Sequence, residues 1–299
     1  MSNYKSLKIL RNVLVFIFIV MIGNASAVSA APLEVYVSIP PQAYITERIG
    51  IEHVNVKVLL QPGQDPHTFE ITPQQIMALG KMKLFFEIGM PFERQLINKI
   101  RDSHRNLAII NTADGIKKRA ICTHHHHHSE INDINKLDPH IWLSPPLIKI
   151  ITSNITNALQ QADPAHSDEY SANLDSFIVE IDALHAQIGE LLKPFKGRSF
   201  YVFHPAFGYF ADTYGLKQVA VEMEGKSPTP KQLNRLIKQA QHENVKVIFV
   251  QPQFDAKSAQ AIAEAIGGAV IPLNSLEKDV LGNLEDIAQK IEKALEEWK

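Results

Sequence analysis

Short runs rich in β-branched and aromatic residues alternate along this chain with stretches of helical spacing or turn residues, and the alternation occurs twice. The first series of apolar runs lies at 33–39, 54–60, 84–88 and 107–111. The second lies at 199–204, 218–222, 245–251 and 269–273, with amphipathic stretches at 231–242 and 256–266. Strands that alternate with helices form parallel sheets connected by helical crossovers. We therefore predict an α/β fold with two Rossmann-like lobes, each built on a four-stranded parallel sheet.

The segment between the two series has the pattern of one long helix. From 167 to 193 it contains a single glycine, Gly189, and no proline before Pro194. Its apolar residues recur at helical spacing, namely Leu174, Phe177, Ile178, Ile181, Leu184, Ile188 and Leu191. At ~1.5 Å per residue the helix would extend on the order of 40 Å as a rigid backbone between the lobes. We expect an N-terminal lobe at 31–163, a linking helix at 164–194 and a C-terminal lobe at 195–299.

The first thirty residues have the order of a secretory signal. Three basic residues (Lys5, Lys8 and Arg11) precede an apolar run at 13–22, and small residues follow through Ala31. The run is too short for a permanent membrane helix, although an uncleaved anchor is the alternative. No cysteine lies directly after it, so a lipid anchor is not expected. We predict that residues 1–30 are a cleavable signal peptide and that the protein is periplasmic.

Charge and cysteine content restrict the possible partners and the source of stability. Removal of residues 1–30, with three basic and no acidic side chains, takes the formal charge from −2 to −5. Nucleic acid is therefore not an expected partner. Cys122 is the only cysteine, so an intramolecular disulfide is excluded and stability must come from packing. We expect a monomer.

The thirteen histidines fall into three groups. Five are scattered, and we interpret these as ordinary surface residues: His53, His104, His166, His185 and His242. Five are consecutive, in a polar segment at 117–137 without a periodic apolar face, which we expect to be a disordered loop. We hypothesise that this loop collects or senses metal ions, and a solvated loop without a role is the alternative. Its histidines are His124, His125, His126, His127 and His128.

The remaining three histidines lie in distinctive local sequences. They are His67 in QDPHTFE, His140 in DPHIWL and His204 in HPAFGYF. Each follows a predicted strand or precedes a helix, and ligands collect at the carboxyl edge of open α/β sheets. Neutral imidazoles suit zinc, and the adjacent prolines stiffen the backbone that would hold them. For any one of these residues alone, a hydrogen-bonded structural role is the competing interpretation.

Together the three segments resemble the ligand motifs of the zinc- and manganese-type periplasmic solute-binding proteins of ABC transporters, the cluster A-I zinc-uptake type. The resemblance extends from Leu33 onward and implies two lobes joined by a long helix, with a metal ion buried between them. It implies that His67, His140 and His204 are the first three ligands and that the protein delivers its metal to a membrane permease. The segment at 224–230 also resembles the family, and there Thr229 would cap a helix with Pro230 in its first turn.

The sequence departs from the family pattern at the fourth ligand. Where the family places an acid in a Leu-Asp-Pro-like segment, this chain has Ile-Pro-Leu-Asn-Ser at 271–275. The fourth position could be Asn274, a water, or a displaced acid such as Glu277 or Asp279. Asn274 could instead satisfy backbone N–H groups at the start of the last helix. Three imidazoles with a neutral fourth ligand favour Zn²⁺, and Mn²⁺ or iron is the alternative.

Two other classes of function share parts of this pattern. Three histidines with an open position also describe a catalytic zinc, for which Glu70 could serve as a base. However, no His-Glu-x-x-His segment is present, and Glu70 fits better as a residue that orients or shields His67. A metal chaperone or adhesin could keep the same fold without serving a transporter. We predict a binding protein and not an enzyme.

Overall fold

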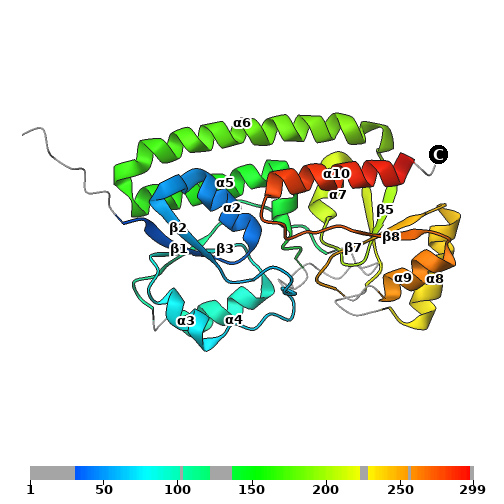
Figure 1. Cartoon of the computed structure of the whole chain (residues 1–299), viewed down its shortest axis with the longest axis horizontal. Helices are drawn as coiled ribbons and strands as arrows, with labels where there is room; N and C mark the ends of the chain where they lie inside the picture. Colours follow the sequence, from blue (N-terminus) through cyan, green and yellow to red (C-terminus); the bar gives the residue numbers. More distant parts are fainter. Residues whose placement is uncertain (1–30, 102–103, 122–136, 223–227, 255–256, 297–299) are drawn as a thin grey trace, which may run out of the picture. The chain divides into compact units, whose positions relative to one another are not determined.

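The computed structural model describes residues 31–101, 104–121, 137–222, 228–254 and 257–296. It contains two four-stranded sheets in which every strand pairing is parallel (Figure 1). The first sheet has the order β2-β1-β3-β4 and the second β6-β5-β7-β8, so both lobes share one topology. The predicted fold is confirmed. The strands are β1 (Leu33–Val37), β2 (Val54–Val58), β3 (Leu84–Glu87), β4 (Ala108–Asn111), β5 (Ser199–Val202), β6 (Lys217–Ala220), β7 (Val247–Val250) and β8 (Ala269–Pro272).

Proline lies in the first turn of helices of both lobes, because its fixed φ suits this turn and its missing N–H is not needed there. Helices α2, α3, α4, α5 and α8 all have proline in this position. Thr229 caps α8 by accepting a hydrogen bond from the Gln232 backbone N–H, as predicted. The helices are α2 (Pro40–Gly50), α3 (Pro73–Leu79), α4 (Pro91–Ile100), α5 (Pro145–Ala162), α6 (Ser167–Leu192), α7 (Gly208–Tyr214), α8 (Pro230–His242), α9 (Lys257–Ala265) and α10 (Val280–Glu296). Short 3₁₀ turns are η1 (Ile51–His53), η3 (Ile141–Leu143), η4 (Pro164–His166) and η5 (Lys193–Phe195).

Both faces of the first sheet are covered, as parallel sheets require. Val35 and Val37 point into the larger core cluster, whereas Tyr36 between them points into a smaller cluster with residues of α3 and α4. Phe86 and Phe85 on β3 divide in the same way. This alternation follows from the two-residue period of a strand, and it explains why the runs read as continuously apolar.

Helix α6 joins the two lobes. Its 26 residues correspond to about 39 Å of helix. It packs against α2 and α5 of the first lobe and against α7 and α10 of the second (Figure 1). The buried side chains of Phe177 and Ile181 on α6 belong to the same core cluster as Val35 of the first sheet and Ile248 of the second. The lobes therefore share one core, and residues from Leu33 onward form one compact unit. The predicted boundaries between lobes and linking helix remain a prediction.

The chain also returns from the second lobe to the first, which the sequence did not reveal. Trp142 Nε1 donates to the Ser275 carbonyl at 2.7 Å, and Lys278 pairs with Glu47 of α2 at 2.8 Å. Helix α10 then packs on α6 and α2. In the part of the chain that the structure describes, no helix combines the length and apolar character needed to cross a membrane.

The expectation of a disordered loop over 117–137 is wrong at both ends of that segment. Ala120 and Leu137 form an antiparallel bridge. Lys118 Nζ donates to the Ile88 carbonyl at 3.2 Å, and the Arg119 backbone N–H donates to the Tyr209 hydroxyl at 2.9 Å. These hydrogen bonds join the ends of the segment to residues distant in sequence. The polar composition of the segment itself therefore does not predict them. Residues 122–136, with the five consecutive histidines, lie outside the described residues.

Candidate metal centre

His67, His140 and His204 meet at one point, although they are separated by 73 and 64 residues of chain. His67 lies in the loop between β2 and α3, His140 directly precedes η3, and His204 follows β5. The Nε2 atoms of His67 and His204 are 3.1 Å apart, and those of His204 and His140 are 3.4 Å apart. Zinc bonds of about 2.0–2.1 Å at tetrahedral angles place two nitrogens about 3.3 Å apart. The spacing of these nitrogens therefore matches a shared ion.

Carboxylates fix the tautomers of the two buried histidines. Asp138 Oδ1 lies 2.8 Å from His140 Nδ1, and Glu222 Oε1 lies 2.9 Å from His204 Nδ1. A carboxylate accepts, so each neutral ring carries its proton on Nδ1 and presents a lone pair on Nε2. Two lone pairs then face each other across 3.4 Å without a proton between them. A cation between the rings would turn this repulsion into attraction.

The backbone around each ligand is also held in place. Gln251, fully buried at the end of β7, accepts from the His204 N–H at 3.1 Å and donates to the His204 carbonyl at 2.7 Å. Asp138 Oδ1 also accepts from the His140 N–H at 3.0 Å, and Asp65 Oδ1 accepts from the His67 N–H at 2.8 Å. These contacts hold the backbone of the three histidines, so an ion bound between them would require little rearrangement.

Burial differs between the ligands and affects their protonation. The side chains of His140 and His204 are 3% and 4% exposed, whereas His67 is exposed as a residue and turns its ring toward the buried pair. Loss of water around its ring and the neighbouring His204 lower the pKa of His67. Burial lowers the pKa of His204, against the opposing effect of its hydrogen bond with Glu222. Both rings therefore favour the neutral form that binds metal.

Phe254 covers one side of the cluster. Its ring stacks on His204 with centroids 4.8 Å apart and an interplanar angle of 20°, and it lies 6.4 Å from the ring of His67. An aromatic ring in this position covers one face of the His204 ring. The low local dielectric strengthens the attraction of the ligands for a cation.

The residues considered for the fourth ligand have other partners. Asn274 Oδ1 accepts from Gln253 Nε2 and from the Leu276 N–H, both at 3.0 Å, and its amide nitrogen donates to Glu277 at 3.1 Å. Asp279 Oδ1 accepts from the Gly282 N–H in the first turn of α10. Thus Asn274 forms a turn before the last helix, and Asp279 takes the capping position that we considered for Asn274. Coordination by Asn274 remains a prediction.

Several site residues were not found by sequence reasoning. Glu222 and Gln251 each end an apolar run, at 218–222 and 245–251, and a polar residue at the end of a buried strand is the signal that could have indicated them. Glu70, which we expected to orient or shield His67, is exposed. The interpretation of the scattered histidines as surface residues holds for His242 alone, because the other four are half-buried.

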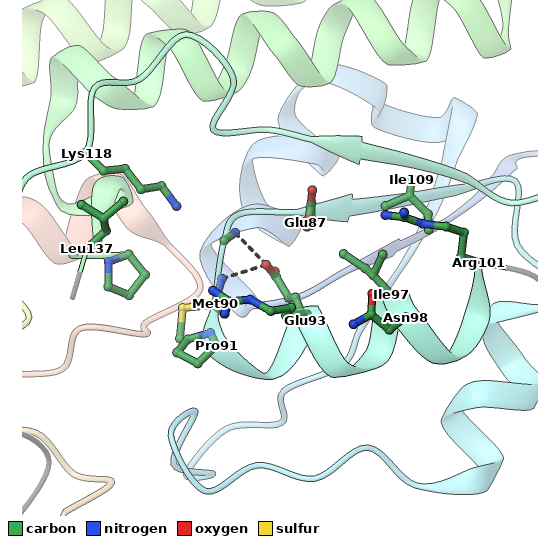
Figure 2. A pocket seen from close by; sticks show the side chains of 13 residues that line it. Glu87, Met90, Pro91, Glu93, Ile97, Asn98, Arg101, Ile109, Lys118 and Leu137 are labelled. Carbon is green, nitrogen blue, oxygen red and sulfur yellow. Dashed lines mark hydrogen bonds between the residues drawn. The ribbon is translucent and has the colours of Figure 1, made fainter. Parts of the chain in front are cut away.

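A separate pocket of about 600 Å³ lies at the carboxyl end of β3 beside α4 (Figure 2). Fully buried Glu93 accepts backbone N–H bonds from Ile88, Gly89 and Met90 at 3.0, 2.6 and 2.7 Å. Burial raises the pKa of Glu93 to about 7, although these bonds favour its charged form. Pro139, the neighbour of His140, lines this pocket, but none of the three histidines is among the described residues that do. The pocket therefore borders the metal centre without being part of it.

Two parallel-sheet lobes, a helix packed along both and a histidine cluster at the strand ends define the class of bilobed metal-binding solute receptors. Within that class, the chain belongs to the ZnuA family: the model of the periplasmic component A of the zinc-uptake complex matches residues 35–296.

Individual relatives agree with this assignment. The high-affinity zinc uptake system protein ZnuA of Bacillus subtilis is 28% identical over 273 residues, which cover 88% of this chain and 86% of the relative. ZnuA of Yersinia pestis is 26% identical over 282 residues, with 85% and 88% covered. A crystal structure of ZnuA superimposes with a TM-score of 0.81 at 38% identity, covering 88% of this chain and 99% of that one. A zinc-bound deletion mutant of ZnuA gives the same TM-score and identity, with 88% and 98% covered.

Proposed function

We propose that this protein binds one zinc ion through Nε2 of His67, His140 and His204 and delivers it to the permease of an ABC transporter. The observation that carries the proposal is the spacing of the three Nε2 atoms, 3.1 Å from His67 to His204 and 3.4 Å from His204 to His140, with the Nδ1 atoms of His140 and His204 turned toward carboxylates. Membership of a zinc-uptake family and the zinc bound to a 38% identical relative support zinc as the cargo.

The choice of zinc over manganese follows from the donor atoms. Manganese prefers oxygen-rich shells, whereas zinc is stable with several imidazoles. Among the described residues, the cluster consists of three histidines and includes no carboxylate oxygen. We propose a water as the fourth ligand, because Asn274, Glu277 and Asp279 form hydrogen bonds elsewhere and His67 lies at the exposed side.

The same proposal places the protein in the periplasm as a monomer that carries its ion without catalysis. The predicted signal peptide at residues 1–30 lies outside the described residues, so the compartment is supported by the family description.

Hydrolysis of an ester or hydration of CO₂ by the zinc-loaded protein would favour the enzyme alternative. Capture of the cognate permease from detergent-solubilised membranes would favour transport over a chaperone or adhesin role, and a protein that never binds it would contradict delivery.

The ligand assignment is tested by single alanine substitutions at His67, His140 and His204. Each should weaken zinc binding by more than about tenfold, because a four-coordinate site loses one of its ligands. Competition titration against a chelator of known affinity measures the change. The same titration with Mn²⁺ should give weaker binding to the unaltered protein.

His242→Ala is the matched control, since it removes an exposed histidine at the end of α8. Its zinc affinity should equal that of the unaltered protein. If all three ligand variants keep full affinity while remaining folded by circular dichroism, the assignment is wrong.

A further inference from the structure

A second group of potential ligands lies on the first lobe and shares no residue with the first. His53 ends η1 directly before the edge strand β2, His166 ends η4, and Glu169 lies in the first turn of α6. Each offers one ligand atom, and these atoms lie within 4.8 Å of one another. The fold has therefore brought together two histidines that are 113 residues apart in the sequence.

The geometry of this group is close to that of a metal site. The imidazoles of His53 and His166 stack with centroids 3.7 Å apart and an interplanar angle of 17°. His53 Nε2 lies 2.9 Å from Glu169 Oε2. A tetrahedral ion with bonds of about 2.0–2.2 Å would separate these two atoms by about 3.3 Å, so a small opening of the contact makes room for it. The two stacked rings must also turn toward a common point, and the partial exposure of their side chains leaves space for this movement.

A carboxylate orients His166 in the manner seen at the main centre. Asp163 Oδ2 lies 2.6 Å from His166 Nδ1 and accepts a hydrogen bond from the Tyr170 hydroxyl at 2.7 Å. His166 therefore keeps its proton on Nδ1 and its lone pair on Nε2, as His140 and His204 do.

We propose that His53, His166 and Glu169 form a second, weaker site for a divalent transition cation such as zinc. Two imidazoles and one carboxylate are a donor set that zinc accepts, with water in the remaining position. The side chains are 18%, 25% and 61% exposed, against 3% and 4% for His140 and His204, so the ion is less shielded and exchanges with solvent. The ion connects the beginning of edge strand β2 to the first turn of α6, and the site fills only after the main centre.

The test counts zinc ions bound to the full mature chain by equilibrium dialysis and elemental analysis at increasing free zinc chloride. The double variant His53→Ala/His166→Ala should bind one zinc fewer per chain than the unaltered protein at high free zinc. Its first, tight ion should bind as before, so the result is independent of the assignment at His67, His140 and His204. High zinc should also raise the melting temperature of the unaltered protein more than that of the double variant, because only the former gains the link between β2 and α6.

His242→Ala serves again as the control, and it should leave both the count and the zinc-dependent melting shift unchanged. Glu169→Gln should bind the second ion more weakly than the unaltered protein, since a neutral amide replaces a carboxylate. An identical zinc count in the double variant and the control would overturn the proposal. Loss of the tight ion from the double variant would overturn it as well, because the two sites would then not be separate.

Discussion

At the scale of single residues, the three histidines of the proposed centre are held in place by neighbouring polar groups. Asp138 and Glu222 determine which nitrogen of His140 and His204 carries the proton, and Gln251 holds the backbone of His204. The motifs around the histidines were sufficient to select the three candidate ligands. Glu222 and Gln251 were not selected, because their role depends on β5, β6 and β7 lying side by side, which no local pattern reports.

The lowered pKa values of His67 and His204 predict a pH dependence of the zinc-free protein. In the unfolded chain these histidines take up protons near pH 6.5, whereas in the folded protein they do so only at lower pH. The unfolded state therefore binds more protons below about pH 6.5, and the free energy of unfolding should fall as the pH decreases through this region. Above about pH 7.5 this contribution should be constant.

Urea unfolding of the zinc-free protein between pH 5 and 8 measures this effect. The double variant His67→Ala/His204→Ala should show a weaker decline on acidification, whereas His242→Ala should follow the unaltered protein. A steeper decline in the double variant would contradict the expected direction of the effect. Zinc retention should fall over the same acidic range, because protons compete for the same lone pairs.

At the scale of elements, the strands and α6 could be predicted from periodicity, because their patterns depend on burial in parallel sheets and on helical spacing. The eight strands fall within a residue or two of the predicted runs. The return of α10 to α2 could not be predicted, since it depends on contacts such as Trp142 with Ser275 that join residues 133 positions apart. The half-buried state of His53 and His166 also depends on contacts between residues that are distant in the sequence.

Gln42 of α2 connects the ends of β1, β3 and β4, and we expect its loss to be costly. It is fully buried in α2, and its Oε1 accepts from the backbone N–H groups of Ser38 and Ile39 at 3.0 and 3.3 Å. Its Nε2 donates to the Phe86 carbonyl and the Thr112 hydroxyl at 3.3 and 3.0 Å. Gln42→Met should lower the free energy of unfolding by about 2–4 kcal/mol, because several buried polar groups lose their partner.

Denaturant unfolding provides the measurement, and Gln260→Met on the exposed face of α9 is the control. The control should remain within about 0.5 kcal/mol of the unaltered protein. If Gln42→Met lowers the free energy of unfolding as little as the control does, then the ends of β1, β3 and β4 do not depend on this side chain.

At the scale of the whole molecule, the lobes are joined by packing and not by a hinge. Residues of both sheets, α6 and α10 belong to one core cluster, and Trp142 and Lys278 connect the lobes through a hydrogen bond and an ion pair. Wide domain closure usually requires a few flexible residues between separate cores. The shared core leaves no such hinge among the described residues.

Zinc release should therefore move the lobes only slightly. Crystal structures of the zinc-loaded and zinc-free protein should superimpose to within about 1 Å over their Cα atoms, as is usual for preorganised binders. Rearrangement is expected to be confined to loops near the ligands, such as the one that carries His67. A rotation of one whole sheet relative to the other would contradict this prediction.

The carboxylates behind His140 and His204 also determine the charge balance of the centre. A zinc ion held by the three histidines would bring its two positive charges close to the carboxylates of Asp138 and Glu222, whose side chains are 2% and 5% exposed. A monovalent cation would balance only half of the charge of these two carboxylates, so we expect the groups behind the histidines to favour ions of charge two.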